Sequence, residues 1–235
     1  MPALYSMCLE IMNSKRVVGI DEAGRGPVVG PMVVAAVALK EEDLSLLLKL
    51  NVKDSKKLLP KTREKLFYKI IENVEKTIII IVNPPTIDYY VNSRESLTEL
   101  EANVFSQAIN ELKPDIIYID AASINSRKFQ RRIENKLKQT NVKIICEHKA
   151  DEKYLPVSAA SIIAKVMRDS LISSIKRFLG ELGSGYPSDP ITKNFIKNLE
   201  IVAKNKNFFR ISWKTIKEPI SSQNILKYTS TYYLL

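Results

Sequence analysis

Blocks of apolar residues along the chain predict strands separated by helices. The apolar runs at 17–20 and 32–39 predict two strands, and the short connection between them favours antiparallel pairing. Further apolar runs predict strands at 78–82, 115–120 and 142–146. The run at 78–82 is continuously β-branched, so we expect that strand to be buried. Helical segments lie between these later strands, which is typical of parallel strands joined by crossover helices. The sequence therefore predicts an α/β fold with a mixed sheet.

The sequence also predicts helices at 43–50, 60–74, 86–91, 96–112, 129–138 and 155–179, and in the segment 96–112 the apolar residues recur at helical spacing. The last of these is apolar on most sides but carries a polar stripe at spacings i, i+3, i+7 and i+10, formed by Ser158, Ser161, Lys165 and Arg168. Such a stripe is either the wall of an active site or an ordinary solvated face. The small Ser and Ala residues at the start of the helix favour the first interpretation.

The composition limits the classes of function. A chain of 235 residues with 45% hydrophobic content fits one large domain, or one domain with a small appendage. The net charge of +10 indicates nucleic acid or an anionic membrane surface as partner, the alternative being simply solvated lysines. No apolar run has the length of a membrane span and no signal peptide is evident, so we expect a cytoplasmic protein.

Few residues are available for soft-metal or histidine chemistry. The two cysteines, Cys8 and Cys146, have no metal-binding spacing, and His148 is the only histidine. Zinc sites, disulfide frameworks and cysteine–histidine pairs are therefore not indicated. The chemistry must rest mainly on carboxylates, lysines and hydroxyls.

Acidic residues follow three of the predicted strands. Asp21 and Glu22 follow the first, Asp120 ends another, and Glu147 with Asp151 follows the last. Ligands of open α/β sheets bind outside the carboxyl ends of the strands, so we expect these acids to gather there. Carboxylates without histidine or thiolate suit Mg²⁺ or Mn²⁺, and two such ions can support phosphodiester hydrolysis. The alternative is that each acid is a solvated strand end.

Two loops offer features that suit a nucleic-acid ligand. Gly24 and Gly26 flank Arg25 directly after the first acids, and backbone without Cβ atoms lets a ligand approach the peptide groups, although an ordinary polar loop is the alternative. Tyr186 lies in the glycine- and proline-rich loop 183–190, where it either stacks on a sugar or base or packs inside a turn. The mixed aromatic and basic segment 208–214 either touches nucleic acid or, as we favour, docks the C-terminal part of the chain.

Several of these residues form motifs of a known family. The motifs occur in order along residues 17 to about 214 and read GIDEAGRGPVVGP from Gly19, DSKKL from Asp54, YIDA from Tyr118, EHKAD from Glu147 with VSAASIIAK from Val157, and GYPSD from Gly185. Together they resemble the motifs of type 2 ribonuclease H, the ribonuclease HII family. The first motif is long and specific, and five motifs in order make chance agreement remote.

The resemblance implies a ribonuclease H-like fold, a mixed sheet flanked by helices, with a helical C-terminal extension. The implied domains are 1–180 for catalysis and 181–235 for the extension and tail. The implied activity is endonucleolytic cleavage of RNA in RNA–DNA hybrids and incision 5′ to ribonucleotides embedded in duplex DNA, leaving 5′-phosphate and 3′-hydroxyl ends. By motif match, the catalytic and metal-binding residues would be Asp21, Glu22, Asp120 and Asp151, with two divalent ions, Mg²⁺ or Mn²⁺, during catalysis.

The resemblance also implies nucleic-acid-binding residues. Gly24, Arg25 and Gly26 match the element that reads the ribose 2′-hydroxyl at an RNA–DNA junction, and Tyr186 matches the tyrosine that stacks on the following sugar. The 2′-hydroxyl is the one group that distinguishes ribose from deoxyribose, which agrees with reading by bare backbone. Charge and position add Lys56, Lys165 and Arg168 as phosphate contacts, and Ser161 as a further nucleic-acid contact.

Some alternatives remain at the level of the sequence. Only about 15 residues precede the first strand, which favours type 2 over the type 3 enzymes with their large N-terminal domain. Some relatives end in a sliding-clamp-binding segment, but Gln223 and the pair Tyr232 and Tyr233 are too far apart for the usual spacing, so a clamp contact through the tail has little support. We expect a monomer. The competing functions are a non-catalytic duplex-binding module and another ribonuclease H-like nuclease, such as a junction resolvase.

Overall fold

A computed structural model describes residues 14–53, 59–93, 95–123 and 125–222. Within them the chain forms two compact units. The first comprises the described residues up to Ala23, Val33–Ile80 and Glu101–Val166. The second comprises Gly24–Met32, Ile81–Leu100 and the described residues from Met167 onward. Each unit is therefore assembled from segments that are distant in sequence. Lys56 and the tail after Ser222 lie outside the described residues.

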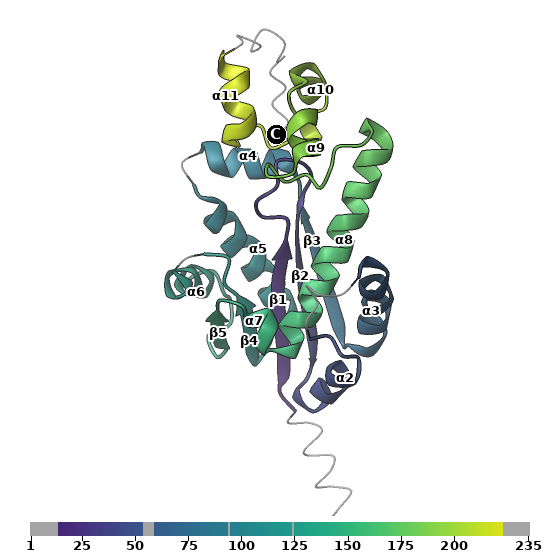
Figure 1. Cartoon of the computed structure of the whole chain (residues 1–235). Helices are drawn as coiled ribbons and strands as arrows, with labels where there is room; N and C mark the ends of the chain where they lie inside the picture. The colour runs from purple at the N-terminus through teal and green to yellow at the C-terminus, as the bar shows by residue number, and fades with distance from the viewer. Residues whose placement is uncertain (1–13, 54–58, 94, 124, 223–235) are drawn as a thin grey trace, which may run out of the picture. The chain divides into compact units, whose positions relative to one another are not determined.

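The first unit is built on a five-stranded mixed sheet with the order β3-β2-β1-β4-β5. Its strands are β1 (Arg16–Ala23), β2 (Met32–Lys40), β3 (Lys76–Val82), β4 (Ile116–Asp120) and β5 (Lys143–Glu147). Strand β1 pairs antiparallel with β2 and parallel with β4, and β4 pairs parallel with β5. Figure 1 shows β1 in the middle of this sheet. The predicted mixed sheet is confirmed.

The expectation that the strand at 78–82 is buried is wrong. Strand β3 is an edge strand of the sheet, most of its residues are half-buried, and Ile81 is 49% exposed. A β-branched run reports that a segment fits a pleated surface, and it does not distinguish a central strand from an edge strand. The fully buried strand is instead β2, in which every residue from Met32 to Leu39 is buried.

Helices occupy the six predicted segments, with shifts of up to four residues at their ends. Those within the first unit are η1 (Glu41–Asp43), α2 (Leu44–Lys49), α3 (Pro60–Asn73), α6 (Ser126–Glu134) and α7 (Ala150–Lys153). Helix α3 begins at a proline, whose missing N–H is not needed in a first turn. Helix α6 begins three residues before the predicted start because Asn125 caps it, accepting a hydrogen bond from the Lys128 N–H.

Two long helices, α5 (Leu97–Leu112) and α8 (Leu155–Leu179), contribute residues to both units. In the first unit the buried residues Phe105 and Ile109 of α5 and Val157 and Ile163 of α8 join the apolar residues of the central strands to form the core. Gly19 of β1 lies against the start of α8, where a Cβ would come within 2.1 Å of the Pro156 carbonyl carbon. The helix therefore meets the strand at a distance that only glycine permits.

The second unit contains α4 (Pro84–Asn92), α9 (Pro190–Phe195), α10 (Leu199–Lys204), η3 (Lys206–Phe208) and α11 (Lys214–Ser222). Side-chain caps begin three of these helices, with Asn83 accepting from Thr86 N, Asp189 from Ile191 N and Asn198 from Ile201 N. Its core is a separate cluster of buried residues: Val28, Val29, Ile172, Ile175, Leu182, Ile196, Val202, Phe209 and Ile216. The predicted docking of the C-terminal segment agrees with the complete burial of Phe209 and Arg210.

Candidate active site

The strand pairing brings Asp21 and Asp120 to the same level of the sheet. Ile20 of β1 is opposite Ile119 of the parallel strand β4, and each is followed directly by an aspartate. Parallel neighbours end at the same edge of a sheet, which is where ligands of α/β proteins bind. Asp21 is buried at 6% exposure, and Asp120 is half-buried.

Asp151 reaches the same place from the short helix α7. Lys149, with a φ of 57°, turns the chain after β5 so that α7 begins at once. The Ala150 N–H donates to Asp120 Oδ1 at 3.3 Å, which fixes the start of α7 beside the end of β4. The hydroxyl of Ser158 on α8 donates to the carbonyl of Asp151. Asp151 is thereby held at 4% exposure.

Asp21, Asp120 and Asp151 form one group of carboxylates, with one oxygen from each lying within 4.8 Å of the others. The electrostatics reflect this crowding. Burial, and after it the negative charge of Asp120, raise the pKa of Asp21 to about 8. Negative charges at such short distances repel one another, which is unfavourable unless a proton or a cation compensates them. The sequence-based expectation that the strand-end acids gather is therefore confirmed for these three residues.

Glu22, the fourth predicted acid, is not a member of this group. Successive side chains of a strand point to opposite faces, so Asp21 and Glu22 leave β1 in different directions. The Glu22 N–H nevertheless donates to Asp21 Oδ1 at 2.7 Å, and the Ser161 hydroxyl also hydrogen-bonds to the Asp21 side chain. Both interactions lower the pKa of Asp21 and partly oppose the effect of burial. Ser161 thus supports the carboxylate from helix α8.

The three carboxylates fit a hard divalent cation. Their donor atoms are oxygens, which suit Mg²⁺ or Mn²⁺ better than softer metals. Cys146, which precedes Glu147 on β5, does not add a thiolate, because burial, with the nearby carboxylate Asp120 next, raises its pKa to about 12. The Nδ1 atom of His148 is hydrogen-bonded to the carbonyl oxygen of Ala121 at 3.2 Å. The donor set is therefore all carboxylate, as the sequence indicated.

In the second unit, residues 24–26 form a turn whose three carbonyl oxygens are all hydrogen-bonded to side chains. Arg210 donates to the carbonyls of Gly24 and Arg25, and Trp213 Nε1 donates to that of Gly26 at 3.1 Å. Gly24 has a φ of +86°, which favours glycine, whereas Gly26 is exposed and a Cβ there would make only an ordinary contact, with the Tyr186 ring. We call this segment, Gly24 to Gly26, the glycine turn.

The loop that carries Tyr186 belongs to the same unit as the glycine turn. Val28 N and Val29 N donate to the Gly185 carbonyl at 2.8 and 3.2 Å, and Gly185 N donates to Thr192 Oγ1 at 2.9 Å. Tyr186 remains 37% exposed, and a Cβ on Gly26 would lie 3.9 Å from its ring. The tyrosine is therefore an accessible aromatic beside the exposed end of the glycine turn.

Arg168 lies behind Tyr186 and against Gly24. Its guanidinium carbon is 5.3 Å from the centre of the Tyr186 ring, and a Cβ on Gly24 would overlap its Nε and Cδ. Arg168 is 2% exposed, yet its buried Nε and Nη2 have no hydrogen-bond partner among the described residues. Burial lowers its pKa. A buried cation with unsatisfied donors is costly, which marks Arg168 as a candidate for binding a ligand.

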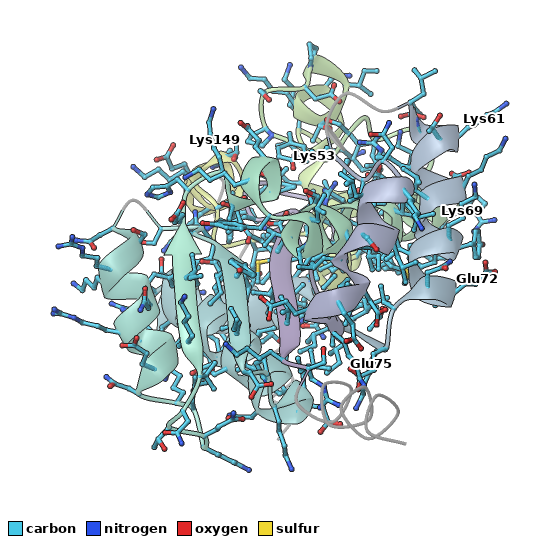
Figure 2. The ribbon with its side chains drawn as sticks, turned by 90° about the horizontal axis from the view of Figure 1, so that it is seen from below. Lys53, Lys61, Lys69, Glu72, Glu75 and Lys149 are labelled. Atoms are coloured by element: carbon cyan, nitrogen blue, oxygen red, sulfur yellow. The ribbon has the colours of Figure 1, made fainter. Side chains whose placement is uncertain are left out.

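Other predicted contacts are less defined. Lys165 is half-buried on α8, and Lys56 lies outside the described residues. Figure 2 shows Lys61 and Lys69 extending outward from α3, with Glu72 on the same helix. Lys149 is close to a carboxylate, its Nζ lying 3.7 Å from Glu152. The basic composition alone therefore does not locate a nucleic-acid surface.

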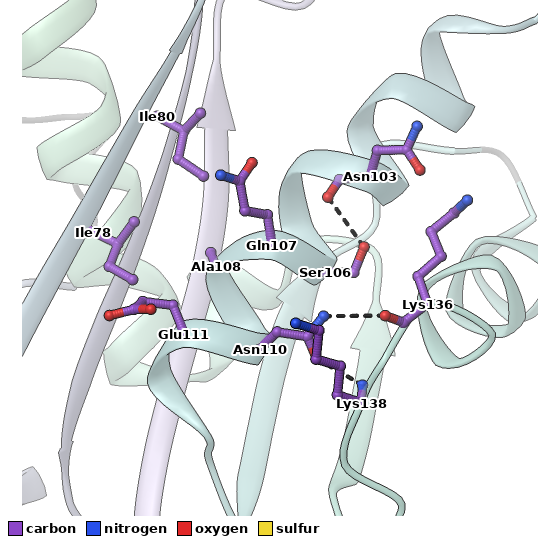
Figure 3. A pocket seen from close by; sticks show the side chains of 10 residues that line it. All are labelled: Ile78, Ile80, Asn103, Ser106, Gln107, Ala108, Asn110, Glu111, Lys136 and Lys138. Carbon is purple, nitrogen blue, oxygen red and sulfur yellow. Dashed lines mark hydrogen bonds between the residues drawn. The ribbon is translucent and has the colours of Figure 1, made fainter.

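A pocket of about 650 Å³ in the first unit does not coincide with the acidic group. It is lined by residues of β3, α5 and the segment after α6: Ile78, Ile80, Asn103, Ser106, Gln107, Ala108, Asn110, Glu111, Lys136 and Lys138 (Figure 3). Asn110 ties its two sides together, donating to the Lys136 carbonyl at 3.1 Å and accepting from Lys138 N at 2.8 Å. None of the predicted site residues lines this pocket.

Sequence reasoning missed the roles of Gly19, Arg210 and Trp213. Gly19 belongs to the first motif, but its importance depends on where α8 crosses β1, which the sequence does not state. Arg210 and Trp213 contact a turn more than 180 residues earlier in the chain. The sequence marked their segment as aromatic and basic, but it did not indicate which part of the chain the segment contacts.

No helix among the described residues is both long and apolar enough to cross a membrane. The five-stranded mixed sheet, with three buried or half-buried aspartates gathered where β1 and β4 end, is that of a ribonuclease H-like α/β protein.

The family model for ribonuclease HII matches residues 18–216, and the chain belongs to the ribonuclease HII family. A ribonuclease HII from Thermococcus sibiricus is 50% identical over 206 residues, which cover 85% of this chain and 89% of the relative. The family resemblance deduced from the sequence is confirmed. The chain is therefore an endoribonuclease that hydrolyses the RNA of RNA–DNA hybrids, and its family requires divalent metal ions.

Solved structures agree with this assignment. The ribonuclease H2 from Pyrococcus horikoshii has a TM-score of 0.79 and 42% identity, covering 89% of this chain and 99% of that one. A structure of the PCNA:RNase HII complex from Archaeoglobus fulgidus has a TM-score of 0.77 and 39% identity, covering 86% of this chain and 96% of that one. The predicted ribonuclease H-like fold is confirmed.

Proposed function

We propose that this ribonuclease incises duplex DNA 5′ to an embedded ribonucleotide as well as degrading the RNA strand of hybrids, leaving 5′-phosphate and 3′-hydroxyl ends. The observation that carries the proposal is the gathering of Asp21, Asp120 and Asp151, from β1, β4 and α7, within 4.8 Å. Such a group destabilises the fold unless a proton or a cation compensates its negative charge.

Asp21, Asp120 and Asp151 would hold the divalent ions, with Glu22 as the fourth acidic residue. Two Mg²⁺ or Mn²⁺ ions, when bound, would supply an activated water and stabilise the leaving oxygen. The residues of the chain keep the carboxylates close, and Ser161 and the Glu22 N–H favour the ionised form of Asp21 that a metal requires.

The glycine turn would read the ribose 2′-hydroxyl, and Tyr186 would stack on the following sugar. The unsatisfied donors of Arg168 support a phosphate contact at this place. Lys56, Ser161 and Lys165 are further proposed nucleic-acid contacts, with Lys56 and Lys165 acting through their charge.

The test uses duplex DNA that contains a single ribonucleotide, a matched all-DNA duplex and a branched DNA. We expect incision 5′ to the ribonucleotide that requires Mg²⁺ or Mn²⁺ and is lost in Asp120→Asn. The control is Asp115→Asn, which changes an exposed aspartate just before the same strand, where it accepts a hydrogen bond from Arg16 N. Binding without cleavage would support a non-catalytic duplex-binding module, and cutting of the branched DNA would support a junction resolvase. Either result would overturn the proposal.

A sliding-clamp contact is a separate proposal. The Archaeoglobus fulgidus relative was solved as a complex with PCNA. In the present chain the contact would involve the tail 223–235, which lies outside the described residues. Binding of the full chain to an immobilised sliding clamp, lost when residues 223–235 are removed, is the expected result. The monomeric state and a cytoplasmic location are likewise proposed.

A further inference from the structure

The glycine turn is held from one side by the segment Arg210 to Trp213. Arg210 Nη1 donates to the Arg25 carbonyl at 2.7 Å, Nη2 donates to the Gly24 carbonyl, and Nε donates to the Gly30 carbonyl at 3.2 Å. Trp213 Nε1 completes the set through the Gly26 carbonyl at 3.1 Å. Two side chains therefore bind every carbonyl of the turn.

Arg210 and Trp213 are themselves held in place by the surrounding structure. Arg210 is fully buried and its guanidinium carbon lies 5.1 Å from the Trp213 ring centre. Arg210 N donates to the Val28 carbonyl at 2.9 Å, and Gly30 N donates to the Phe208 carbonyl at 2.8 Å. These two backbone hydrogen bonds join the segment that contains Arg210 to the segment that follows the glycine turn.

Asp88 of helix α4 holds the segment from the other end. Its carboxylate accepts hydrogen bonds from Ile211 N and Ser212 N, each at 3.0 Å, and from the Ser212 hydroxyl. The charge of Arg210 also acts on Asp88 and favours its ionised form against the effect of burial. A buried arginine with this many carbonyl partners and a nearby carboxylate is satisfied without a ligand.

We propose that Arg210 and Trp213 are positioning residues for ribose discrimination, a role that rests on the proposed reading of the 2′-hydroxyl by the glycine turn. They fix the peptide planes of Gly24, Arg25 and Gly26 from the buried side, while Gly26 is exposed beside Tyr186. Backbone groups recognise a hydroxyl only when their directions are fixed, because a hydrogen bond weakens steeply with misalignment.

The two positions can be changed without altering charge. Arg210→Lys keeps the positive charge but replaces the planar fork with a single ammonium group, which cannot bond three carbonyls in the same geometry. Trp213→Phe removes the donor to Gly26 and keeps an aromatic ring under the guanidinium. Val202→Ala is the control, because Val202 is a fully buried residue of the same core cluster with no contribution to the turn's hydrogen bonds.

The experiment measures the affinity of each full-length variant for a duplex with one ribonucleotide and for the matched all-DNA duplex. Fluorescence anisotropy in Ca²⁺ is used, with a denaturing gel to check that the duplexes stay intact. The ratio of the two affinities reports ribose reading separately from phosphate binding. We expect this ratio to fall about fivefold or more in Arg210→Lys and Trp213→Phe, with all-DNA affinity within about twofold of wild type.

The outcomes separate this inference from the function on which it rests. A wild-type ratio of one would overturn the proposed ribose reading and this inference with it. A wild-type ratio above one that both variants retain would overturn the inference alone. The inference would also be overturned if Val202→Ala, at a comparable loss of thermal stability, lowered the affinity ratio as much as the two variants do. The lower ratio would then follow from destabilisation in general. If Arg210→Lys does not fold, Trp213→Phe at a half-buried position decides the question.

Discussion

The hydroxyl of Ser161 on α8 hydrogen-bonds to the buried carboxylate of Asp21 on β1 and lowers its pKa. A metal ligand must be deprotonated, so this bond should help Asp21 bind a cation at neutral pH. We expect Ser161→Ala to raise the Mg²⁺ concentration for half-maximal activity about tenfold at pH 7, and by less at pH 9. Metal titrations of cleavage at both pH values measure this.

The same variant distinguishes two roles for Ser161. A direct nucleic-acid contact would instead weaken duplex binding in the absence of metal at both pH values. Ser173→Ala, an exposed serine of the same helix whose hydroxyl donates to Asp169 O at 2.9 Å, is the control and should leave both properties unchanged.

Asp21 should also make the metal-free protein less stable as pH rises. Its pKa is about 8 in the folded protein against 3.8 ordinarily, so between these values the folded state binds a proton that the unfolded state has released. Stability therefore falls as pH rises through this window. We expect Asp21→Asn to be more stable than wild type by about 5 kcal/mol at pH 8 with EDTA, and similar to it near pH 4.

Thermal unfolding of both proteins across pH measures that difference, and Mg²⁺ should stabilise wild type but not the variant. Asp115→Asn is the matched control. Equal stability of wild type and Asp21→Asn at pH 8 without metal would contradict the raised pKa.

Local patterns predicted most of the architecture. The alternation of apolar runs and helical periods placed the five strands of the described residues. The acids at strand ends predicted the gathering of Asp21, Asp120 and Asp151, because parallel strands such as β1 and β4 end at one edge. The edge position of β3 was missed, since strand order depends on pairing partners that lie far away in the sequence.

The part of the site that depends on long-range contacts was not predictable. The stripe Ser158, Ser161, Lys165 and Arg168 was recognised by its period, but its members have different roles in the structure. Ser158 bonds the Asp151 carbonyl, Ser161 bonds Asp21, and Arg168 packs on Tyr186. Periodicity assigns a face of a helix, whereas the partner on that face is set by the tertiary fold.

Gly26→Ala tests whether incision depends on the absence of a side chain at this position, without a change in stability. A Cβ there would meet only the Tyr186 ring at 3.9 Å, an ordinary contact, so Gly26→Ala should leave the melting temperature unchanged. The methyl group would project at the exposed end of the turn. We therefore expect about a tenfold loss of incision at a single ribonucleotide. Unchanged incision would show that the ligand does not approach this backbone.

Gly19→Ala provides the contrasting case. Its Cβ would lie 2.1 Å from the Pro156 carbonyl carbon and 2.3 Å from Val157 N, both backbone atoms that cannot move aside. We expect a loss of about 3 kcal/mol or more in stability, measured by denaturant unfolding. A stability equal to wild type would contradict the close approach of α8 to β1.

A substitution of Arg168 should affect the stability of the protein and its binding of substrate in different ways. The Nε and Nη2 atoms of this buried side chain have no partner among the described residues, so their desolvation is uncompensated in the free protein. Arg168→Met keeps an apolar stem of similar length and removes these donors. We expect the melting temperature to stay the same or rise, while the KM for a ribonucleotide-containing duplex increases about tenfold. Thermal unfolding and steady-state cleavage measure the two effects. A lower melting temperature with an unchanged KM would assign Arg168 a purely structural role against Tyr186.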